Sequence, residues 1–312
     1  MLNFSFVVFG LLLLIAGGDY LLKSSVALSL KLNISKLVIG MTVVSFATSA
    51  PELLVSVNAA ISGIPDLSLG NVVGSNIANL GLVLGVTLLL GRIDIKSSFY
   101  KIDWPMLMIA TITFYGFVVF DYQLDATEGL LMFSGLILFL IYLLSSGKDE
   151  GVVDDFSEDD ETLNWGRTIL YFFIGGVALW GGSELLVVGS KALAVDFGVS
   201  DRVIGITVVS VGTSIPELAA SIMAMLKKEK AISIGNLIGS NIFNLFAVLG
   251  ITSMITPIPV GDPNLINSDA LYMMGISALL LALVFIPRKM SLGLRDGLIL
   301  LSVYIYFIYQ VL

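Results

Sequence analysis

One segment of this chain occurs twice. Residues 38–87 align with residues 203–252 at a constant offset of 165 positions, without a gap, and more than half of the aligned residues are identical. Each copy contains a Thr-Ser pair, a proline and a glutamate in an apolar stretch, and continues with Gly-Asn and Gly-Ser-Asn. Similarity at a fixed spacing indicates a structural unit that is built twice. We therefore expect two related halves, and we call 38–87 the first motif and 203–252 the second motif.

The composition predicts that both halves lie in a membrane. Of the 312 residues, 57% are hydrophobic and only 13% are charged, whereas soluble domains contain about 25% charged residues. Apolar stretches of roughly 17–25 residues, the length that crosses a bilayer, recur along the whole chain. They are too long and continuous for barrel strands of about 10 alternating residues. The first of them lacks the basic start of a signal peptide, so we expect it to be a retained helix.

These stretches predict the fold class. We expect an all-α polytopic membrane protein with ten transmembrane helices, arranged as two inverted five-helix repeats. The first repeat would comprise residues 1–146 and the second residues 165–312, joined by an acidic linker at 147–164. The expected helices are 4–22, 37–61, 67–90, 104–121, 127–146, 165–188, 202–226, 231–255, 268–286 and 292–311.

The basic residues predict how the chain is oriented. When successive loops are assigned to alternate sides, 14 of the 16 Lys and Arg residues fall on one side, and only Lys191 and Arg202 fall on the other. Basic residues are enriched in cytoplasmic loops, so we expect the linker in the cytoplasm, both termini outside, and a location in the cell (plasma or inner) membrane. Because each repeat has an odd number of helices, the second inserts upside down. Inverted repeats are typical of secondary transporters, whose binding site lies near the membrane midplane where the repeats meet.

Each motif places a glutamate inside a predicted membrane helix, where a charge is costly and usually functional. These residues are Glu52 and Glu217, which directly follow Pro51 and Pro216. A proline donates no backbone hydrogen bond, so each one frees a carbonyl group that must face protein or a polar cavity. The Thr-Ser pair three and four residues before each glutamate lies on the same helical face.

The next predicted helix of each repeat has a polar stripe at four-residue spacing. Its members are Asn71, Ser75 and Asn79 in the first motif, and Asn236, Ser240 and Asn244 in the second. Together with the glutamates, these helices offer carboxylate, hydroxyl, amide and carbonyl oxygens. The chain contains no His and no Cys, so the hard oxygen donors suit Na⁺ or Ca²⁺ rather than zinc or copper. Two carboxylates would neutralise one divalent cation, and without a cation they would tend to bind protons.

The same residues also allow structural interpretations. Small and polar faces of membrane helices commonly serve helix packing, and a Thr-Ser pair can bond back to its own helix. A buried glutamate can be a protonated member of a helix interface. The acidic linker lacks the spaced ligands and the glycine of an EF-hand, so we expect a solvated linker rather than a Ca²⁺ sensor.

The two motifs resemble the α-repeats of a known family. Ser-Phe-Ala-Thr-Ser-Ala-Pro-Glu with Gly-Asn-Val-Val-Gly-Ser-Asn, and Ser-Val-Gly-Thr-Ser-Ile-Pro-Glu with Gly-Asn-Leu-Ile-Gly-Ser-Asn, look like the paired repeats of the sodium/calcium exchangers, within the cation/Ca²⁺ exchanger (CaCA) superfamily. The length and the short linker are similar to those of prokaryotic members, so the resemblance covers essentially the whole chain. It implies an antiporter for Na⁺ and Ca²⁺ in a lipid bilayer, and not an enzyme. No catalytic residue, organic cofactor, nucleic acid or obligate protein partner is expected.

The resemblance also implies which residues bind the ions, in four sites clustered between the second, third, seventh and eighth helices. Glu52 and Glu217 would be shared by Na⁺ and Ca²⁺, and the backbone carbonyls of Thr48 and Thr213 would contribute to the Ca²⁺ position. The Na⁺ positions would take the hydroxyls of Ser49, Ser75, Ser214 and Ser240 and the carbonyls of Ser45 and Ser210. Asn79 and Asn244 would line the middle.

Two departures from related families narrow the expected function. Potassium-dependent exchangers look to have Asp where this chain has Asn244, which argues against K⁺ co-transport. Proton-coupled Ca²⁺ exchangers usually carry a glutamate after Gly-Asn, where this chain has Val72-Val73 and Leu237-Ile238. H⁺/Ca²⁺ exchange nevertheless stays open as an alternative, as does a non-transporting channel or membrane scaffold. An intramembrane hydrolase would need a nucleophile with a base, or an aspartate pair, and neither is evident.

Overall fold

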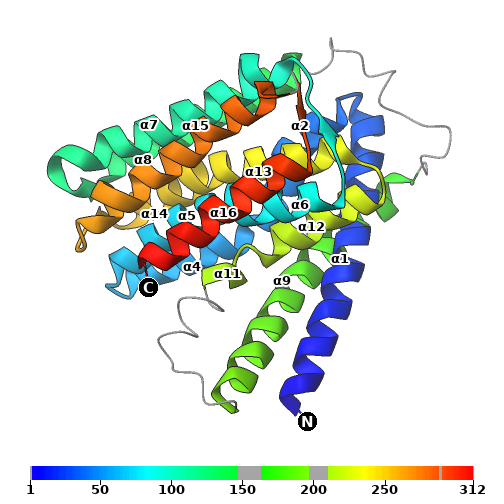
Figure 1. The fold of residues 1–312 in the computed structure, drawn as a ribbon, viewed down its shortest axis with the longest axis horizontal. Coiled ribbons are helices and arrows are strands. Elements are labelled where there is room, and N and C mark those ends of the chain that lie inside the picture. Colours follow the sequence, from blue (N-terminus) through cyan, green and yellow to red (C-terminus); the bar gives the residue numbers. More distant parts are fainter. Residues whose placement is uncertain (1, 147–162, 197–209, 288–289, 312) are drawn as a thin grey trace.

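The computed structural model describes residues 2–146, 163–196, 210–287 and 290–311, and this part of the chain is almost entirely helical (Figure 1). The first half contains α1 (Leu2–Leu32), α2 (Lys36–Ile39), the π-helical turn η1 (Gly40–Val44), α3 (Ser45–Thr48), α4 (Ala50–Ile61), α5 (Pro65–Ala78), the π-helical turn η2 (Asn79–Val83), α6 (Leu84–Leu90), the π-helical turn η3 (Phe99–Asp103), α7 (Trp104–Asp121) and α8 (Ala126–Ser146). The second half contains α9 (Trp165–Asp196), α11 (Ser210–Gly212), α12 (Ile215–Leu226), α13 (Lys230–Phe243), the π-helical turn η6 (Asn244–Leu249), α14 (Gly250–Ile255), the π-helical turn η7 (Leu265–Ala270), α15 (Leu271–Phe285) and α16 (Leu294–Val311).

The helices make this a multi-pass membrane protein. Eight described stretches are long and apolar enough to cross a bilayer, namely Phe4–Leu32, Pro65–Leu90, Phe99–Asp121, Ala126–Ser145, Trp165–Ser190, Lys230–Ile255, Leu265–Phe285 and Leu294–Val311. A ninth arises if Lys36–Thr48 and Ala50–Ile61, which meet at a 44° bend, count as one span. The expected helix at 202–226 lies partly outside the described residues. The count of ten therefore stays a prediction, as do the domain boundaries and the placement of the linker at 147–164.

Two helices are longer than the sequence predicts. α1 continues to Leu32 instead of ending at residue 22, and α9 continues to Asp196 instead of ending at residue 188. The polar residues near the middle of α1 do not end it, because Asp19 forms an ion pair with Lys23 one turn later (2.9 Å). The hydroxyls of Ser24 and Ser25 bond back to a carbonyl of the same helix, which also keeps the backbone helical.

α1 and α9 lie side by side and extend away from the other helices (Figure 1). Glycines permit their close approach: a Cβ atom on Gly10 would lie 2.8 Å from the Gly182 carbonyl oxygen, and one on Gly17 would lie 2.8 Å from the Leu179 nitrogen. Small residues commonly allow membrane helices to pack closely. The two helices therefore form a paired unit beside the rest of the protein.

The all-helical expectation needs one small correction. β1 (Ile93–Asp94) pairs with β4 (Ser291–Leu292), and β2 (Gln123–Leu124) pairs with β3 (Ile258–Pro259), both antiparallel. Each pair joins a loop of the first half to a loop of the second, where backbone groups outside the helices need partners. These strands have two residues each, so they connect the halves without changing the helical class.

The spans that carry the motifs lie at the centre of the molecule. In the most apolar windows of Pro65–Leu90 and Lys230–Ile255, 78% and 83% of the residues are buried, against 28% for Trp165–Ser190. The polar stripes are therefore surrounded by protein, whereas the outer helices present apolar side chains to the surroundings. This arrangement positions the candidate site.

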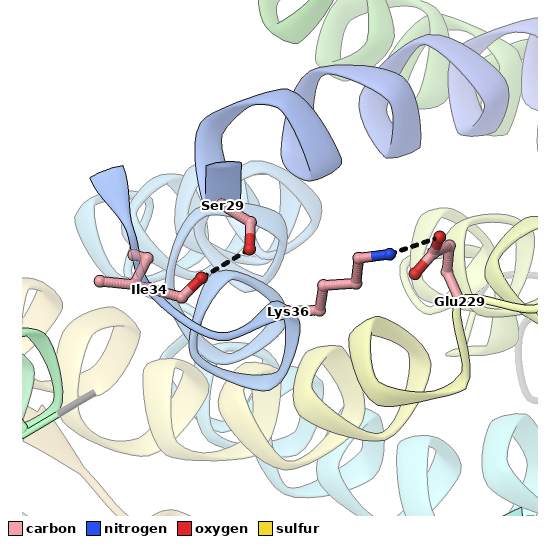
Figure 2. Close-up of polar contacts among 4 residues, drawn as sticks. All are labelled: Ser29, Ile34, Lys36 and Glu229. Carbon is pink, nitrogen blue, oxygen red and sulfur yellow. Dashed lines mark hydrogen bonds and ion pairs between the residues drawn. The ribbon is translucent and has the colours of Figure 1, made fainter. Parts of the chain in front are cut away.

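A buried ion pair also joins the two halves. Lys36 at the start of α2 lies 2.9 Å from Glu229, just before α13, and Figure 2 shows the two side chains meeting across the gap between their helices. Nearby, the hydroxyl of Ser29 donates to the Ile34 carbonyl at the turn between α1 and α2. An ion pair with so little exposure is costly to disrupt by removing one partner. It therefore constrains how α2 and α13 sit relative to each other.

Candidate cation site

Each glutamate lies in the first turn of a helix that begins directly after a serine with non-helical backbone angles. Ser49 and Ser214 precede α4 and α12 with almost the same backbone angles, φ −85° and ψ 1° against φ −87° and ψ 2°. A proline near the first helical position is favourable, because the amide it lacks would have no partner in the helix. The start of a helix also favours a negative side chain. α4 and α12 therefore begin alike, and Glu52 and Glu217 occupy equivalent positions in their first turns.

The two glutamates are fully buried and lie near enough for their charges to repel each other. Both are 0% exposed, and the charge of Glu217 acts directly on Glu52. The hydroxyls of Thr48, Ser49 and Ser240 lie beside the Glu217 carboxyl group, but among the described residues none has the geometry of a hydrogen bond to it. A buried ionised carboxylate without a partner is very unfavourable. Each glutamate therefore needs a proton or a cation.

Buried oxygen atoms without a hydrogen-bond partner, which we call open oxygens, occur at equivalent positions of the two motifs. In the described ranges, the buried oxygens without a hydrogen-bond partner include Ser49 Oγ, both carboxyl oxygens of Glu52 and Asn79 Oδ1, and equally Ser214 Oγ, both carboxyl oxygens of Glu217 and Asn244 Oδ1. Buried polar atoms normally have a partner. A symmetric group of open carboxylate, hydroxyl and amide oxygens has the chemistry of a site for Na⁺ or Ca²⁺. Zinc or copper would prefer nitrogen or sulfur ligands.

The predicted hydroxyl ligands Ser75 and Ser240 each contact a threonine hydroxyl of the other repeat. Ser75 Oγ lies 3.1 Å from Thr213 Oγ1, and Thr48 Oγ1 lies 3.2 Å from Ser240 Oγ. These two contacts are equivalent under the repeat. A hydroxyl that takes part in one bond keeps further acceptor capacity, so the contacts bring the four residues together and leave them able to bind a cation.

Ser45 has a structural contact besides its predicted role. Its hydroxyl lies within hydrogen-bond distance of the carbonyls of Gly40 (2.9 Å) and Asn236 (3.0 Å). Its single hydrogen can be donated to either one, and the contact with Asn236 joins α3 to α13. Its equivalent, Ser210, begins α11, and its side chain lies outside what the structure describes.

Two serines that the sequence alone did not single out, Ser56 and Ser221, bond to the first asparagine of each polar stripe. Asn71 Nδ2 donates to Ser56 Oγ at 3.0 Å, and Asn236 Nδ2 donates to Ser221 Oγ at 3.4 Å. A further missed pair, Asn76 and Asn241, is described below. All of these residues are identical in the two motifs, and that identity was the signal that could have revealed them.

Over nearly its whole length the chain is similar to proteins of one family. The family described as sodium/calcium exchanger protein matches residues 2–145 and 167–312. The chain is 38% identical over 311 residues to the proposed antiporter CaxA of Alkalimonas amylolytica, covering 97% of each protein. It is 31% identical to sodium/calcium exchanger MaX1 of Methanosarcina acetivorans, covering 98% of this chain and 97% of that protein. Among solved structures it matches the sodium-calcium exchanger NCX_Mj with a TM-score of 0.84 and 29% identity, covering 99% of this chain and 98% of that chain.

Proposed function

Because this chain belongs to the sodium/calcium exchanger family, we propose that it exchanges Na⁺ for Ca²⁺ through one shared site around Glu52 and Glu217. The observation that carries this proposal is the symmetric set of buried, open oxygen atoms in the two motifs. Because the same carboxylates would bind either Na⁺ or Ca²⁺, the two ions cannot occupy the centre together. That exclusion would couple the movement of one ion to the movement of the other.

We assign the ligands as the resemblance implies. The glutamates would neutralise Ca²⁺ with two charges, aided by the carbonyls of Thr48 and Thr213. The Na⁺ positions would use Ser49, Ser75, Ser214 and Ser240 with the carbonyls of Ser45 and Ser210, and Asn79 and Asn244 would line the middle. With Asn rather than Asp at 244, the centre has one negative charge fewer, so we propose that transport does not require K⁺.

Alternating access would then move the site from one side of the membrane to the other. Our candidates for the moving gate are α1 and α9, supported by their close mutual packing and by their position beside the other helices. Gly17 and Gly18 lie inside α1 and Gly181 and Gly182 inside α9, so they are not hinges between helices. Gly17 and Gly182 lie in the close contact of α1 with α9, and Gly18 contacts Met223 of α12. In this proposal the linker lies in the cytoplasm and both termini lie outside the cell membrane.

A cross-link tests the gate. A Cβ atom on Gly18 would lie 3.3 Å from Met223 Cβ on α12, near the range of roughly 3.5–4.5 Å found in disulfides. The chain has no cysteine, so Gly18→Cys with Met223→Cys would give a unique disulfide that fixes α1 to α12. We expect oxidation to stop transport and reduction to restore it. Leu13→Cys with Gly182→Cys joins α1 to α9 and should transport when oxidised. Full transport by the oxidised α1–α12 protein would exclude this gate.

The coupling ion decides between this proposal and its alternatives. We would measure ⁴⁵Ca²⁺ uptake into proteoliposomes preloaded with Na⁺, K⁺ or acidic buffer. Na⁺/Ca²⁺ exchange predicts uptake with internal Na⁺, without added K⁺ and without a pH gradient. Uptake driven by acid alone would favour H⁺/Ca²⁺ exchange. Passive uptake, or none, would favour a channel or a membrane scaffold.

A further inference from the structure

Asn76 and Asn241 lie where the two motifs meet, and they form a reciprocal pair. Nδ2 of Asn76 donates to the backbone carbonyl of Asn241 at 3.2 Å, and Nδ2 of Asn241 donates to the backbone carbonyl of Asn76 at 3.2 Å. Each residue is 1% exposed. The pair therefore joins α5 to α13 in a place that bulk water does not reach.

The side-chain oxygens of the same two residues hold two of the candidate ligands. Nδ2 of Asn79 donates to Asn241 Oδ1 at 3.0 Å, and Nδ2 of Asn244 donates to Asn76 Oδ1 at 3.1 Å. The four side chains form one connected network, which we call the asparagine cluster. In the described part of the chain, Oδ1 of Asn79 and Oδ1 of Asn244 are the two buried amide oxygens of this cluster without a partner.

The backbone fixes the orientation of every amide in the asparagine cluster. A backbone carbonyl can only accept, so Asn76 must turn its nitrogen toward the Asn241 carbonyl and its oxygen the other way. That oxygen also only accepts, so Asn244 must turn its nitrogen toward it. The oxygen of Asn244 then points out of the cluster. The same argument, with the motifs exchanged, orients Asn79.

The local helix geometry explains why these carbonyls can take part. α5 and α13 each change into a π-helical turn at the ligand itself, at Asn79 and at Asn244. The backbone N–H of Asn79 donates to the backbone carbonyls of Ser75 and Asn76. In the second motif, the backbone N–H of Asn244 donates to those of Ser240 and Asn241. A carbonyl oxygen has two lone pairs, so it can also accept the side-chain bond from the other motif. Short π-helical segments frequently occur at functional sites.

We propose that Asn76 and Asn241 are positioning residues, which hold the amide oxygens of Asn244 and Asn79 toward the bound cation. This proposal rests on the proposed function, because it requires a cation at the centre. A reversed Asn244 would direct N–H groups at the cation and weaken its binding. A carboxylate presents oxygen in either orientation, so a chain with Asn at this position needs an orienting neighbour that a chain with Asp does not.

A double-mutant cycle tests this role. We would compare Asn76→Ala in the natural chain and in an Asn244→Asp background. The two readouts are the Ca²⁺ concentration that half-saturates Na⁺-dependent uptake, and the Ca²⁺ concentration that gives half of the rise in Tm in detergent. In the natural chain we expect Asn76→Ala to weaken Ca²⁺ binding roughly ten-fold, since Asn244 loses the acceptor that orients it. In the Asn244→Asp background the same substitution should change Ca²⁺ binding by less than about two-fold.

Three controls accompany the cycle. Asn76→Asp is the conservative variant: when protonated it keeps one donor and one acceptor, the two that Asn76 uses in the cluster, and should bind Ca²⁺ within about three-fold of the natural chain. Ser277→Ala removes a buried hydroxyl that bonds within α15, and should leave Ca²⁺ binding unchanged. The mirrored cycle, Asn241→Ala with Asn79→Asp, repeats the test on the other motif. It replaces the first cycle if the Asn76→Ala variant does not fold.

The outcomes separate the two proposals. Equal weakening by Asn76→Ala in both backgrounds, or no weakening in the natural chain, would overturn the positioning role. If Ca²⁺ raises the Tm of the natural chain but there is no Na⁺-dependent uptake, the proposed function is overturned. The positioning role is then still tested by the Ca²⁺ dependence of Tm in the double-mutant cycle. A Tm that responds to neither Ca²⁺ nor Na⁺ would overturn both.

Discussion

The two motifs share most of their residues, and they match closely at the centre but not at the ends. At the centre, the contact between Ser75 and Thr213 has its counterpart between Thr48 and Ser240, at 3.1 and 3.2 Å. Farther out, Asn236 is 1% exposed and accepts a hydrogen bond from Thr48. Its equivalent Asn71 is half-buried and donates to the Glu52 carbonyl instead.

In the second motif, the helix α13 is also more deeply buried than its equivalent α5 in the first motif. Every residue from 232 to 243 in α13 is buried, and the ion pair of Lys36 with Glu229 lies at the start of this helix (Figure 2). The position equivalent to Glu229 in the first motif is Ile64, which has no charge. In an inverted-repeat transporter, the site near the midplane is shared and the ends alternate. Residues that are identical in the two motifs therefore build the common centre. Positions at which the motifs differ, such as Ile64 and Glu229, and residues outside them, such as Lys36, distinguish the two ends.

The largest expected effect tests the symmetry of the centre. Glu52→Gln and Glu217→Gln should each weaken Ca²⁺ binding by at least roughly 100-fold, equivalent to about 3 kcal/mol, because each removes one of two buried charges that would neutralise the ion. The measurement is ⁴⁵Ca²⁺ uptake together with the Ca²⁺-dependent rise in Tm. Asp94→Asn, at an exposed position of β1, is the control and should bind normally. If either variant still binds and transports Ca²⁺ normally, the two glutamates do not contribute equally to the site.

A smaller effect, on the free energy of unfolding, should distinguish the packing of α13 from that of α5. A Cβ atom on Gly239 would lie 2.5 Å from the Met41 carbonyl oxygen and against the Ser45 hydroxyl, whereas no described atom lies within 4 Å of a Cβ atom on the equivalent Gly74. Gly239→Ala should therefore reduce stability by about 2 kcal/mol through overpacking, and Gly74→Ala by much less. Thermal unfolding in detergent compares the two variants. Equal decreases in Tm would mean that the motifs are packed alike.

The ion pair should have an intermediate effect that is confined to one end. Lys36→Met leaves Glu229 without this partner, and the side chains are only 7% and 16% exposed, so we expect a loss of about 1–2 kcal/mol in unfolding free energy. Exchanging the charges, Lys36→Glu with Glu229→Lys, should recover part of that loss. Arg295→Met, which removes an exposed charge, is the matched control. An unchanged Tm for Lys36→Met would show that this contact does not hold α2 to α13.

The smallest effect concerns the hydroxyls that anchor the outer asparagines. Ser56→Ala and Ser221→Ala each remove one acceptor, worth about 0.5–1.5 kcal/mol at most. Ser56→Ala should have the larger effect, because its bond to Asn71 is 3.0 Å long while that of Ser221 to Asn236 is 3.4 Å. Half-saturating Ca²⁺ concentrations should rise by less than roughly three-fold. A loss as large as that of the glutamate variants would instead place these serines among the ligands.

Much of the architecture could be predicted from the sequence, because membrane spans follow local rules. The expected helices at 67–90 and 231–255 appear as Pro65–Leu90 and Lys230–Ile255, since continuous apolar stretches of bilayer length have few alternatives. The length of α1 could not be predicted in this way. Its extension past Asp19 depends on an ion pair with Lys23 and on a second one with Lys227 of the other half, and a polar residue in the sequence does not reveal whether it has a partner.

The duplication, the membrane-spanning character and the polar faces of the helices follow from residue type and spacing within one segment, so they can be read from the sequence. What those faces contact depends on how the helices pack together. The bond of Asn79 to Asn241 joins residues 162 positions apart, and the ion pair of Lys36 with Glu229 joins residues 193 apart. Which oxygens stay open for a cation depends on these contacts between the repeats. A helical period specifies the face on which a side chain lies, but its hydrogen-bond partner comes from another part of the chain.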